Sequence, residues 1–153
     1  MVSNPSRQDR IFVDSSVLIS ASISKSGYAR DLIFLGIDGS VQLVASAYVL
    51  EETRRNLARK SPGAIEFFRT FLELGIVQLV DPPRSLVVQV AHRVEPKDAA
   101  IIAGAIAADC PVIATFDRRH LLAEADQILR DWAVHVEMPG AIIQRLSIRG
   151  GED

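Results

Sequence analysis

The 153-residue sequence has few of the residues that build disulfide-linked or zinc-binding proteins. Its single cysteine, Cys110, cannot form an intramolecular disulfide, and its apolar setting predicts a small buried side chain. The three histidines stand at neither H-x-x-x-H nor H-E-x-x-H spacing, which argues against a structural zinc site. No apolar run is long enough to span a membrane, and residues 1–9 lack the apolar core of a secretory signal. These absences together predict a protein of the reducing cytoplasm.

The chain also lacks an excess of positive charge and the glycine motifs that hold nucleotide phosphates. A formal net charge of −2 excludes a uniformly basic nucleic-acid coat protein, although it leaves room for a local basic strip. Neither G-x-G-x-x-G nor a Walker A motif occurs, so nucleotide binding has no support. What is present is a globular balance, with 48% hydrophobic and 24% charged residues in a length that suits one domain.

Short apolar strands alternate with helical patterns along most of the chain. We expect strands over residues 10–14, 41–46, 76–81, 110–117 and 133–139. We expect helices over residues 15–25, 28–39, 47–60, 64–75, 84–94, 96–109, 118–125 and 140–148. This alternation predicts an α/β fold in which a parallel sheet is covered on both faces. We place the domain at residues 10–147, between a flexible N-terminus (1–9) and a flexible tail (148–153).

Two acids follow apolar strands at the edge where such sheets bind ligands. Right-handed crossovers bring the carboxyl ends of all parallel strands to one edge, and ligands bind there where the strand order reverses. Asp14 ends the first strand, in "RIFVDSSVLIS", and Asp117 ends the strand "CPVIATFD". Either acid alone could be a helix N-cap. Two of them at one edge favour a site, and they lie close together if their strands are neighbours.

Two further acids are carried to the same edge by helices. Asp98 lies in the first turn of an otherwise apolar helix that leads into the second acid-ending strand. Its alternative role is compensation of the helix dipole, worth about 0.3–1 kcal/mol. On the helix over residues 47–60, Glu52 flanks the inward face and Glu51 points further away. The alternative for Glu52 is an ordinary ion pair with Arg55.

Four carboxylates at one edge repel one another and need a cation. Ligands that are all oxygen suit Mg²⁺ or Mn²⁺ better than Zn²⁺. Such an ion can acidify water and stabilise charge on a phosphoryl oxygen, so no histidine or cysteine nucleophile is required.

The segments "IFVDSSVLISA", "ASAYVLEETRRNL" and "PKDAAIIAGAIAADCPVIATFDRRHL" resemble, in order and spacing, the motifs of the PIN domain family. This family comprises metal-dependent ribonucleases, including the toxins of many toxin–antitoxin pairs, and the resemblance covers roughly residues 10–138. It implies a three-layer α/β/α sandwich with a five-stranded, mostly parallel sheet. The matching positions are Asp14 (the first Asp), Glu52 (the Glu on a helix), Asp98 (before the alanine-rich helix) and Asp117 (in T-x-D), with Ser16 and Thr115 as supporting hydroxyls.

The resemblance implies hydrolysis of single-stranded RNA with Mg²⁺ or Mn²⁺. Asp14, Asp98 and Asp117 would hold one or two ions, directly or through water, and Glu52 would orient or activate a water molecule. The candidates for binding the RNA backbone are Arg54, Arg55, Arg118 and Arg119, and Arg59, Lys60 and His120 add positive charge nearby. Family members often form homodimers, and the toxins are blocked by an antitoxin protein, so both are candidate partners.

Two alternatives belong to other classes. A non-catalytic PIN-like module that binds protein or RNA has no need to keep four acids together. A phosphorylation receiver generally has paired acids near the first strand and a lysine at the end of the last, and "AVHVEMP" offers no lysine. A phosphoaspartate phosphatase requires D-x-D, where this chain has Asp14-Ser15-Ser16.

Overall fold

The computed structural model describes residues 6–151, which contain five strands and eight α-helices. The strands are β1 (Arg10–Val13), β2 (Gln42–Ala45), β3 (Val77–Leu79), β4 (Val112–Ala114) and β5 (His135–Glu137). The helices are α1 (Ser15–Ile23), α2 (Tyr28–Ile37), α3 (Ala47–Lys60), α4 (Ile65–Glu73), α5 (Arg84–Ala91), α6 (Pro96–Ala107), α7 (Ala125–Trp132) and α8 (Pro139–Gly151). Within residues 6–151, none of the helices is both long and apolar enough to cross a membrane.

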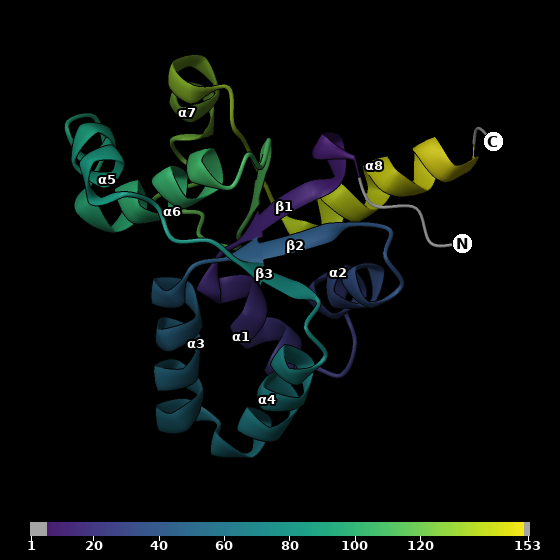
Figure 1. Cartoon of the computed structure of the whole chain (residues 1–153). Coiled ribbons are helices and arrows are strands. Elements are labelled where there is room, and N and C mark those ends of the chain that lie inside the picture. Colours follow the sequence, from purple (N-terminus) through teal and green to yellow (C-terminus); the bar gives the residue numbers. More distant parts are fainter. Residues whose placement is uncertain (1–5, 152–153) are drawn as a thin grey trace.

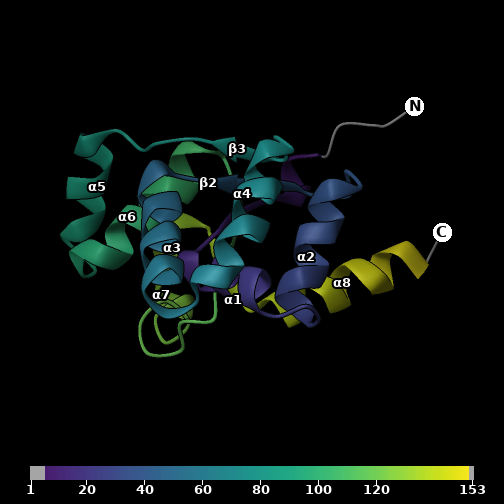
Figure 2. The same ribbon diagram turned by 90° about the horizontal axis from the view of Figure 1, so that it is seen from below.

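All five strands are parallel, and their order in the sheet is β3-β2-β1-β4-β5. From β1 the chain adds β2 and β3 on one side. It then crosses to the other side of β1, where it adds β4 and β5. Helices α1 to α4 lie below the sheet in Figure 1, and α5 to α7 lie above it. Figure 2 shows the lower layer face on, with α8 beside α2. The predicted three-layer α/β/α sandwich is confirmed.

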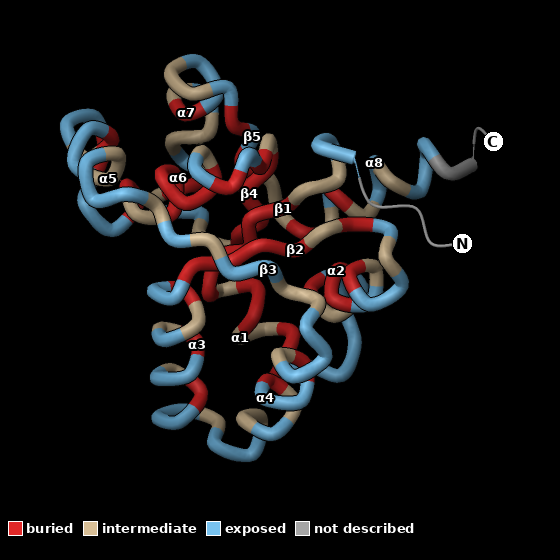
Figure 3. Tube along the Cα trace, viewed as in Figure 1, coloured by how far each residue is buried: buried red, intermediate tan, exposed pale blue. Residues whose placement is uncertain are grey.

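Two glycines let helices approach opposite faces of the sheet closely. A Cβ on Gly104 of α6 would lie 2.6 Å from the Phe12 ring of β1, and one on Gly36 of α2 would lie 2.7 Å from the Leu43 side chain of β2. Leu43 is in register with Ile11, the residue before Phe12, so the two contacts are on opposite faces. Because both faces are covered, the central strands β1, β2 and β4 are mostly buried on both sides, and Figure 3 shows the centre of the sheet as buried.

The structure corrects the helix that the sequence predicted over residues 118–125. Residues 118–124 form turns, and α7 begins only at Ala125. The side chain of Asp117 accepts hydrogen bonds from the backbone N–H groups of Arg119 and His120, each at 3.2 Å. Such a side-chain bond offers the backbone an alternative to helix, which local periodicity does not reveal.

The ends of the chain also differ in part from the prediction. Residues 7–9 of the predicted flexible N-terminus form a short 3-10 helix. At the other end, α8 continues to Gly151, beyond the predicted end of the domain at residue 147. Residues 1–5 and 152–153 lie outside the described residues, so the domain limits stay a prediction.

Candidate metal-binding and catalytic site

The first and last of the four predicted acids follow neighbouring strands. β1 pairs with β4, and the backbone N–H of Asp14 donates to the carbonyl of Ala114 at 3.0 Å, one step beyond the strand ends. Asp117 lies three residues after β4 ends. The strand order reverses between β1 and β4, so both acids lie at the point where open α/β sheets bind ligands.

All four predicted carboxylates line one pocket of about 280 Å³, here called the acidic pocket. They come from four places in the chain: the end of β1, helix α3, the first turn of α6 and the loop after β4. The carboxylates are Asp14, Glu52, Asp98 and Asp117. The other charged or hydrogen-bonding side chains of the lining are Ser15, Ser16, Tyr48, Asn56, Lys97, Arg119 and His120.

Asp14 is held by hydrogen bonds on both carboxylate oxygens. Its Oδ1 accepts from the backbone N–H of Ser15 at 2.8 Å, at the start of α1. Its Oδ2 accepts from the hydroxyls of Thr115 at 2.7 Å and Ser16 at 3.0 Å. Both acceptor positions of Oδ2 are therefore used, and one remains on Oδ1. The cap and the site are not alternatives, because the same carboxylate supports its helix and faces the pocket.

The two hydroxyls also connect Asp14 to the loop that carries Asp117. Ser16 Oγ accepts from the backbone N–H of Phe116, and Thr115 Oγ1 accepts from the backbone N–H of Asp117, each at 3.0 Å. Thr115 is fully buried, whereas Ser16 is partly exposed at the pocket. The two hydroxyls thus link the Asp14 carboxylate to the backbone of the loop that carries Asp117. Their role in orienting metal ligands stays a prediction.

Asp98 is a buried carboxylate with incomplete compensation. It is 3% exposed, and within residues 6–151 its Oδ2 has no hydrogen-bond partner. Burial raises the pKa of Asp98, and the nearby acids Glu124 and Asp117 add to the rise, while His120 opposes it. His120 Nδ1 and Glu124 Oε2 are likewise buried without a partner in the described part of the chain. Buried polar atoms of this kind are normally satisfied, so this end of the pocket suits water or a cation.

Glu52 faces the pocket and Glu51 faces solvent, as the helical phase predicted. The side chain of Glu52 is 21% exposed, and Lys97 Nζ lies 3.9 Å from its Oε1. Glu51 instead binds Arg54, whose Nη2 lies 2.5 Å from Glu51 Oε1. The ordinary helix ion pair therefore belongs to Glu51.

The tyrosine hydroxyl at the start of α3 lies in the field of these charges. Burial raises the pKa of Tyr48, and the carboxylates of Glu52 and Asp14 raise it further, while Lys97 opposes them. The ammonium group of Lys97 and the carboxylates of Glu52 and Asp14 thus all act on the hydroxyl of Tyr48.

The donor set fits a hydrated divalent cation. Within residues 6–151, no three His, Cys, Asp or Glu side chains are arranged as a group that could hold a metal ion. The pocket nevertheless offers four carboxylates, with a partnerless oxygen on Asp98. Mg²⁺ keeps several of its own waters and takes few protein ligands, so ligation partly through water agrees with both observations.

Of the four arginines proposed to bind the RNA backbone, two line a pocket near the four carboxylates and two do not. Arg119 lines the acidic pocket. Arg55 lines an adjoining pocket, here called the basic pocket, which is formed by Tyr48, Glu52, Arg55, Asn56, Arg59 and Lys97. Arg54 and Arg118 line neither pocket: the first pairs with Glu51 and the second contacts Met138 Sδ at 3.8 Å.

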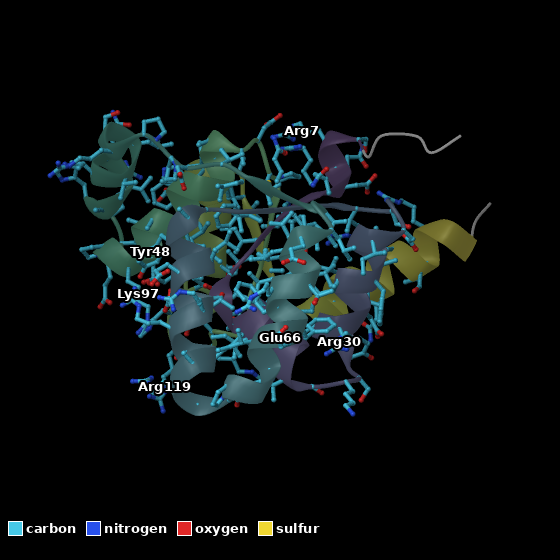
Figure 4. The ribbon with its side chains drawn as sticks, turned by 60° about the horizontal axis from the view of Figure 1, so that its bottom comes forward. Arg7, Arg30, Tyr48, Glu66, Lys97 and Arg119 are labelled. Carbon is cyan, nitrogen blue, oxygen red and sulfur yellow. The ribbon has the colours of Figure 1, made fainter. Side chains whose placement is uncertain are left out.

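The lining residues that were not predicted include Tyr48, Asn56 and Lys97, which are shared by both pockets. Tyr48 and Asn56 stand four residues before and after Glu52, so the helical phase of α3 could have identified them. Lys97 is next to Asp98 in the sequence, but its place beside Glu52 depends on how α6 packs near α3. Figure 4 shows Tyr48 and Lys97 together on one side of the molecule, with Arg7 far from them.

Comparisons with known proteins agree with the fold. The PIN domain model matches residues 11–127, so the chain belongs to the PIN domain family. The fold is similar to VapBC2 from Rickettsia felis bound to a DNA fragment from their promoter, with 15% identity, a TM-score of 0.59, and coverage of 84% of this chain and 98% of that one. No curated protein matches the chain.

Two further solved structures have the same fold. PAE2754 from Pyrobaculum aerophilum has 18% identity and a TM-score of 0.61, over 91% of this chain and 96% of that one. VapC20 from Mycobacterium tuberculosis, described as a Sarcin-Ricin loop cleaving toxin, has 17% identity and a TM-score of 0.52, over 74% of this chain and 94% of that one. At these identities the likeness shows the fold alone.

Proposed function

We propose that this chain is an endoribonuclease that uses Mg²⁺ or Mn²⁺ to hydrolyse phosphodiester bonds of single-stranded RNA. The observation that carries this proposal is the acidic pocket, where four carboxylates from four separate parts of the chain meet. Membership of the PIN domain family supports a nuclease in general. The four carboxylates support a divalent metal, the resemblance to the family supports an RNA substrate, and the roles of the residues are our inference from both.

Asp14, Asp98 and Asp117 are the residues that would hold the ion, directly or through water. When bound, a divalent cation supplies the Lewis acidity that activates water and stabilises charge on a phosphoryl oxygen. Ser16 and Thr115 keep the Asp14 carboxylate in place through the bonds of 3.0 and 2.7 Å.

Glu52 is the candidate to orient the attacking water and accept its proton. It is partly exposed on the wall of the pocket, where a water could reach it. Lys97 and Arg119 line the same pocket and supply positive charge toward an approaching phosphate.

We infer that the biological role is that of the toxin in a toxin–antitoxin pair, with an antitoxin protein as partner. The support is the fold shared with VapBC2 and with the VapC20 toxin, and with FitAB bound to IR36 DNA fragment. Induced expression of the chain should arrest growth, and co-expression of the product of an adjacent small gene should relieve the arrest. If the Asp14→Asn variant arrests growth equally, the arrest does not come from this site. Light scattering on the purified chain tests the homodimer.

The direct test is a cleavage assay on end-labelled single-stranded RNA. We expect cleavage with Mg²⁺ or Mn²⁺, none with EDTA, and weaker cleavage of duplex RNA and of single-stranded DNA. The Asp14→Asn variant, purified in parallel, controls for contaminating ribonuclease. If wild type cuts none of several RNAs with either ion, the nuclease proposal is wrong. RNA binding without cleavage would favour the non-catalytic module instead.

A further inference from the structure

The basic pocket adjoins the acidic pocket and shares four residues with it. Its volume is about 460 Å³. The shared residues are Tyr48, Glu52, Asn56 and Lys97. The two pockets are therefore parts of one continuous depression that crosses from the carboxyl edge of the sheet onto helix α3. Nothing in the catalytic proposal uses the second part.

One face of α3 forms most of the wall of the basic pocket. The residues it contributes are Tyr48, Glu52, Arg55, Asn56 and Arg59, spaced three or four apart wherever they are not adjacent. At a rise of about 1.5 Å per residue, this wall runs about 16 Å along the helix from the first to the last. That length exceeds what a single phosphate group can contact, so the ligand it suits is a chain.

The charge of the depression reverses along this wall. The acidic pocket holds four carboxylates with two basic side chains, Lys97 and Arg119. The basic pocket holds Arg55, Arg59 and Lys97 with a single carboxylate, Glu52, at the boundary. A cation at the acidic end and arginines at the other end would both attract a polyanion, which makes the whole depression complementary to a phosphodiester chain.

The arginines of the basic pocket are not used in strong ion pairs. On the same helix Arg54 binds Glu51 at 2.5 Å, while Arg55 lies 3.9 Å from that carboxylate. Arg59 forms no ion pair within residues 6–151, and its Nη2 lies 3.5 Å from Asn56 Oδ1. The guanidinium groups of Arg55 and Arg59 are therefore available to a ligand.

Tyr48 stands where the two pockets meet. Its side chain is large and 43% exposed, so the ring is available to a ligand. Exposed aromatic rings beside a positively charged groove are the usual platforms for bases of single-stranded nucleic acid, because every base has a face that can stack.

We propose that the basic pocket binds the part of a single-stranded RNA that flanks the scissile phosphate, with Arg55 and Arg59 on its phosphates and Tyr48 stacked on a base. This inference rests on the proposed function of the acidic pocket, since it gives the same strand a path onto α3. In this proposal Tyr48 strengthens RNA binding by stacking on a base, and the two arginines strengthen it by their charge.

Binding of a fluorescently labelled single-stranded oligoribonucleotide, measured by anisotropy in EDTA over a range of salt, tests the charge contacts. The double variant Arg55→Gln, Arg59→Gln should lower the slope of log affinity against log salt by about 1.4, since each phosphate contact on a single strand contributes about 0.7. The matched control is Arg7→Gln, Arg149→Gln. It removes two arginines that bind Asp109 and Asp9 before β4 and β1, at the opposite edge of the sheet.

The stacking contact has a different signature. Tyr48→Ala should lower affinity by about 5- to 150-fold, the range of one base–aromatic stack, and leave the salt slope unchanged. Tyr48→Phe keeps the ring and should bind like wild type. In the cleavage assay with Mg²⁺, the arginine double variant should raise KM and leave kcat nearly unchanged.

The outcomes separate the two proposals. If wild type binds and cuts RNA while the Arg55, Arg59 double variant matches the Arg7, Arg149 control in slope and KM, only the strand site is overturned. If wild type binds RNA through Tyr48 and the arginines but never cuts it, only the nuclease proposal is overturned. If wild type binds no RNA in EDTA or in Mg²⁺, both are wrong. Equal thermal melting of the variants checks that each remains folded.

Discussion

The two edges of the sheet treat acidic side chains in opposite ways. At the amino edge, Asp9 before β1 binds Arg149 at 2.5 Å, and Asp109 before β4 binds Arg7 at 2.7 Å. Each pair is exposed and worth about 0–1 kcal/mol. At this edge an acid therefore has a basic partner, as on most protein surfaces.

At the carboxyl edge some acids are also paired, since Glu52 lies 3.9 Å from Lys97 and Glu137 binds Arg145, but the three aspartates of the acidic pocket are not. Asp14, Asp98 and Asp117 form no ion pair with any basic side chain in residues 6–151. Asp14 and Asp98 are also buried, but Asp14 accepts three hydrogen bonds, whereas Asp98 Oδ2 has no partner in residues 6–151, and a buried charge without a partner destabilises the fold. Asp9 and Asp109 at the amino edge thus have basic partners, whereas the three aspartates of the acidic pocket have none among the described residues, and the proposed metal site would account for this difference.

Position after a strand is not enough to define the site. Asp81 follows β3 at the same edge, and its Oδ1 accepts from the backbone N–H of Ala47 at 2.8 Å, close to the start of α3. It is exposed and lines neither the acidic nor the basic pocket. Asp81 thus satisfies a backbone N–H of the first turn of α3 from outside that helix, whose N-cap is Ser46.

The largest difference in cleavage rate is expected between two variants that each replace one acid, Asp14 at the carboxyl edge or Asp9 at the amino edge. Asp14→Asn should lower cleavage of single-stranded RNA by at least about 100-fold, because it removes a charged candidate metal ligand. Asp9→Asn removes a carboxylate of the same kind at the amino edge and should leave the rate unchanged. Both rates are measured under the same Mg²⁺ conditions. If both variants lose cleavage activity equally, the difference between the two edges is unrelated to cleavage.

A smaller loss should follow from removing a hydroxyl that positions Asp14. Thr115→Val keeps the shape but deletes the donor to Asp14 Oδ2 and the acceptor for the Asp117 N–H. We expect a fall of about 10- to 100-fold in kcat, the range for groups that orient metal ligands. Thr115→Ser restores the hydroxyl and should recover most of the rate. If serine and valine are equally inactive, packing and not the hydrogen bonds explains the loss.

Asp98 offers a stability readout that needs no enzyme assay. In EDTA at pH 7, Asp98→Asn should raise the free energy of unfolding by about 1 kcal/mol, because it replaces a buried charge that lacks a partner. Added Mg²⁺ should stabilise wild type more than the variant, since only wild type keeps the full ligand set. Chemical denaturation with and without Mg²⁺ measures both.

The pH dependence of that difference follows from the raised pKa of Asp98, which burial causes. A carboxyl whose pKa is higher in the folded state binds its proton more tightly there, so folding is favoured at acidic pH. This contribution is lost as the pH rises through the raised pKa. The variant and wild type should therefore converge in stability at acidic pH and separate toward neutral pH. A constant difference across the range would show that Asp98 is not the titrating group.

Much of the fold was predictable from local patterns. Apolar strands without a polar side indicated a sheet covered on both faces, and the glycine contacts of Phe12 and Leu43 show how this is achieved. The order of the strands was not predictable, because it depends on pairing between distant segments. The sequence therefore predicted that Asp14 and Asp117 lie close together only if their strands are neighbours. The structure shows that they are, because β1 pairs with β4.

The candidate site was predictable where it follows helical phase or strand ends. The choice of Glu52 over Glu51 came from phase alone and agrees with their exposure and ion pairs. Lys97 was missed because its contact with Glu52 joins two helices far apart in sequence. The turn after Asp117 was missed because a side-chain bond to the backbone overrides a helical pattern of apolar residues.

The smallest effect is expected at the amino edge, where the one cysteine lies just before β4. Cys110 is 2% exposed, and burial raises the pKa of its thiol to about 12. Because the thiolate is the reactive form, a thiol-alkylating reagent at pH 8 should label the denatured chain fully and the native protein hardly at all. Cys110→Ala should cleave RNA at the wild-type rate, since the residue lies at the edge opposite the acidic pocket. Rapid labelling of the native protein, or a loss of cleavage in the variant, would place chemistry at both edges and remove the contrast between them.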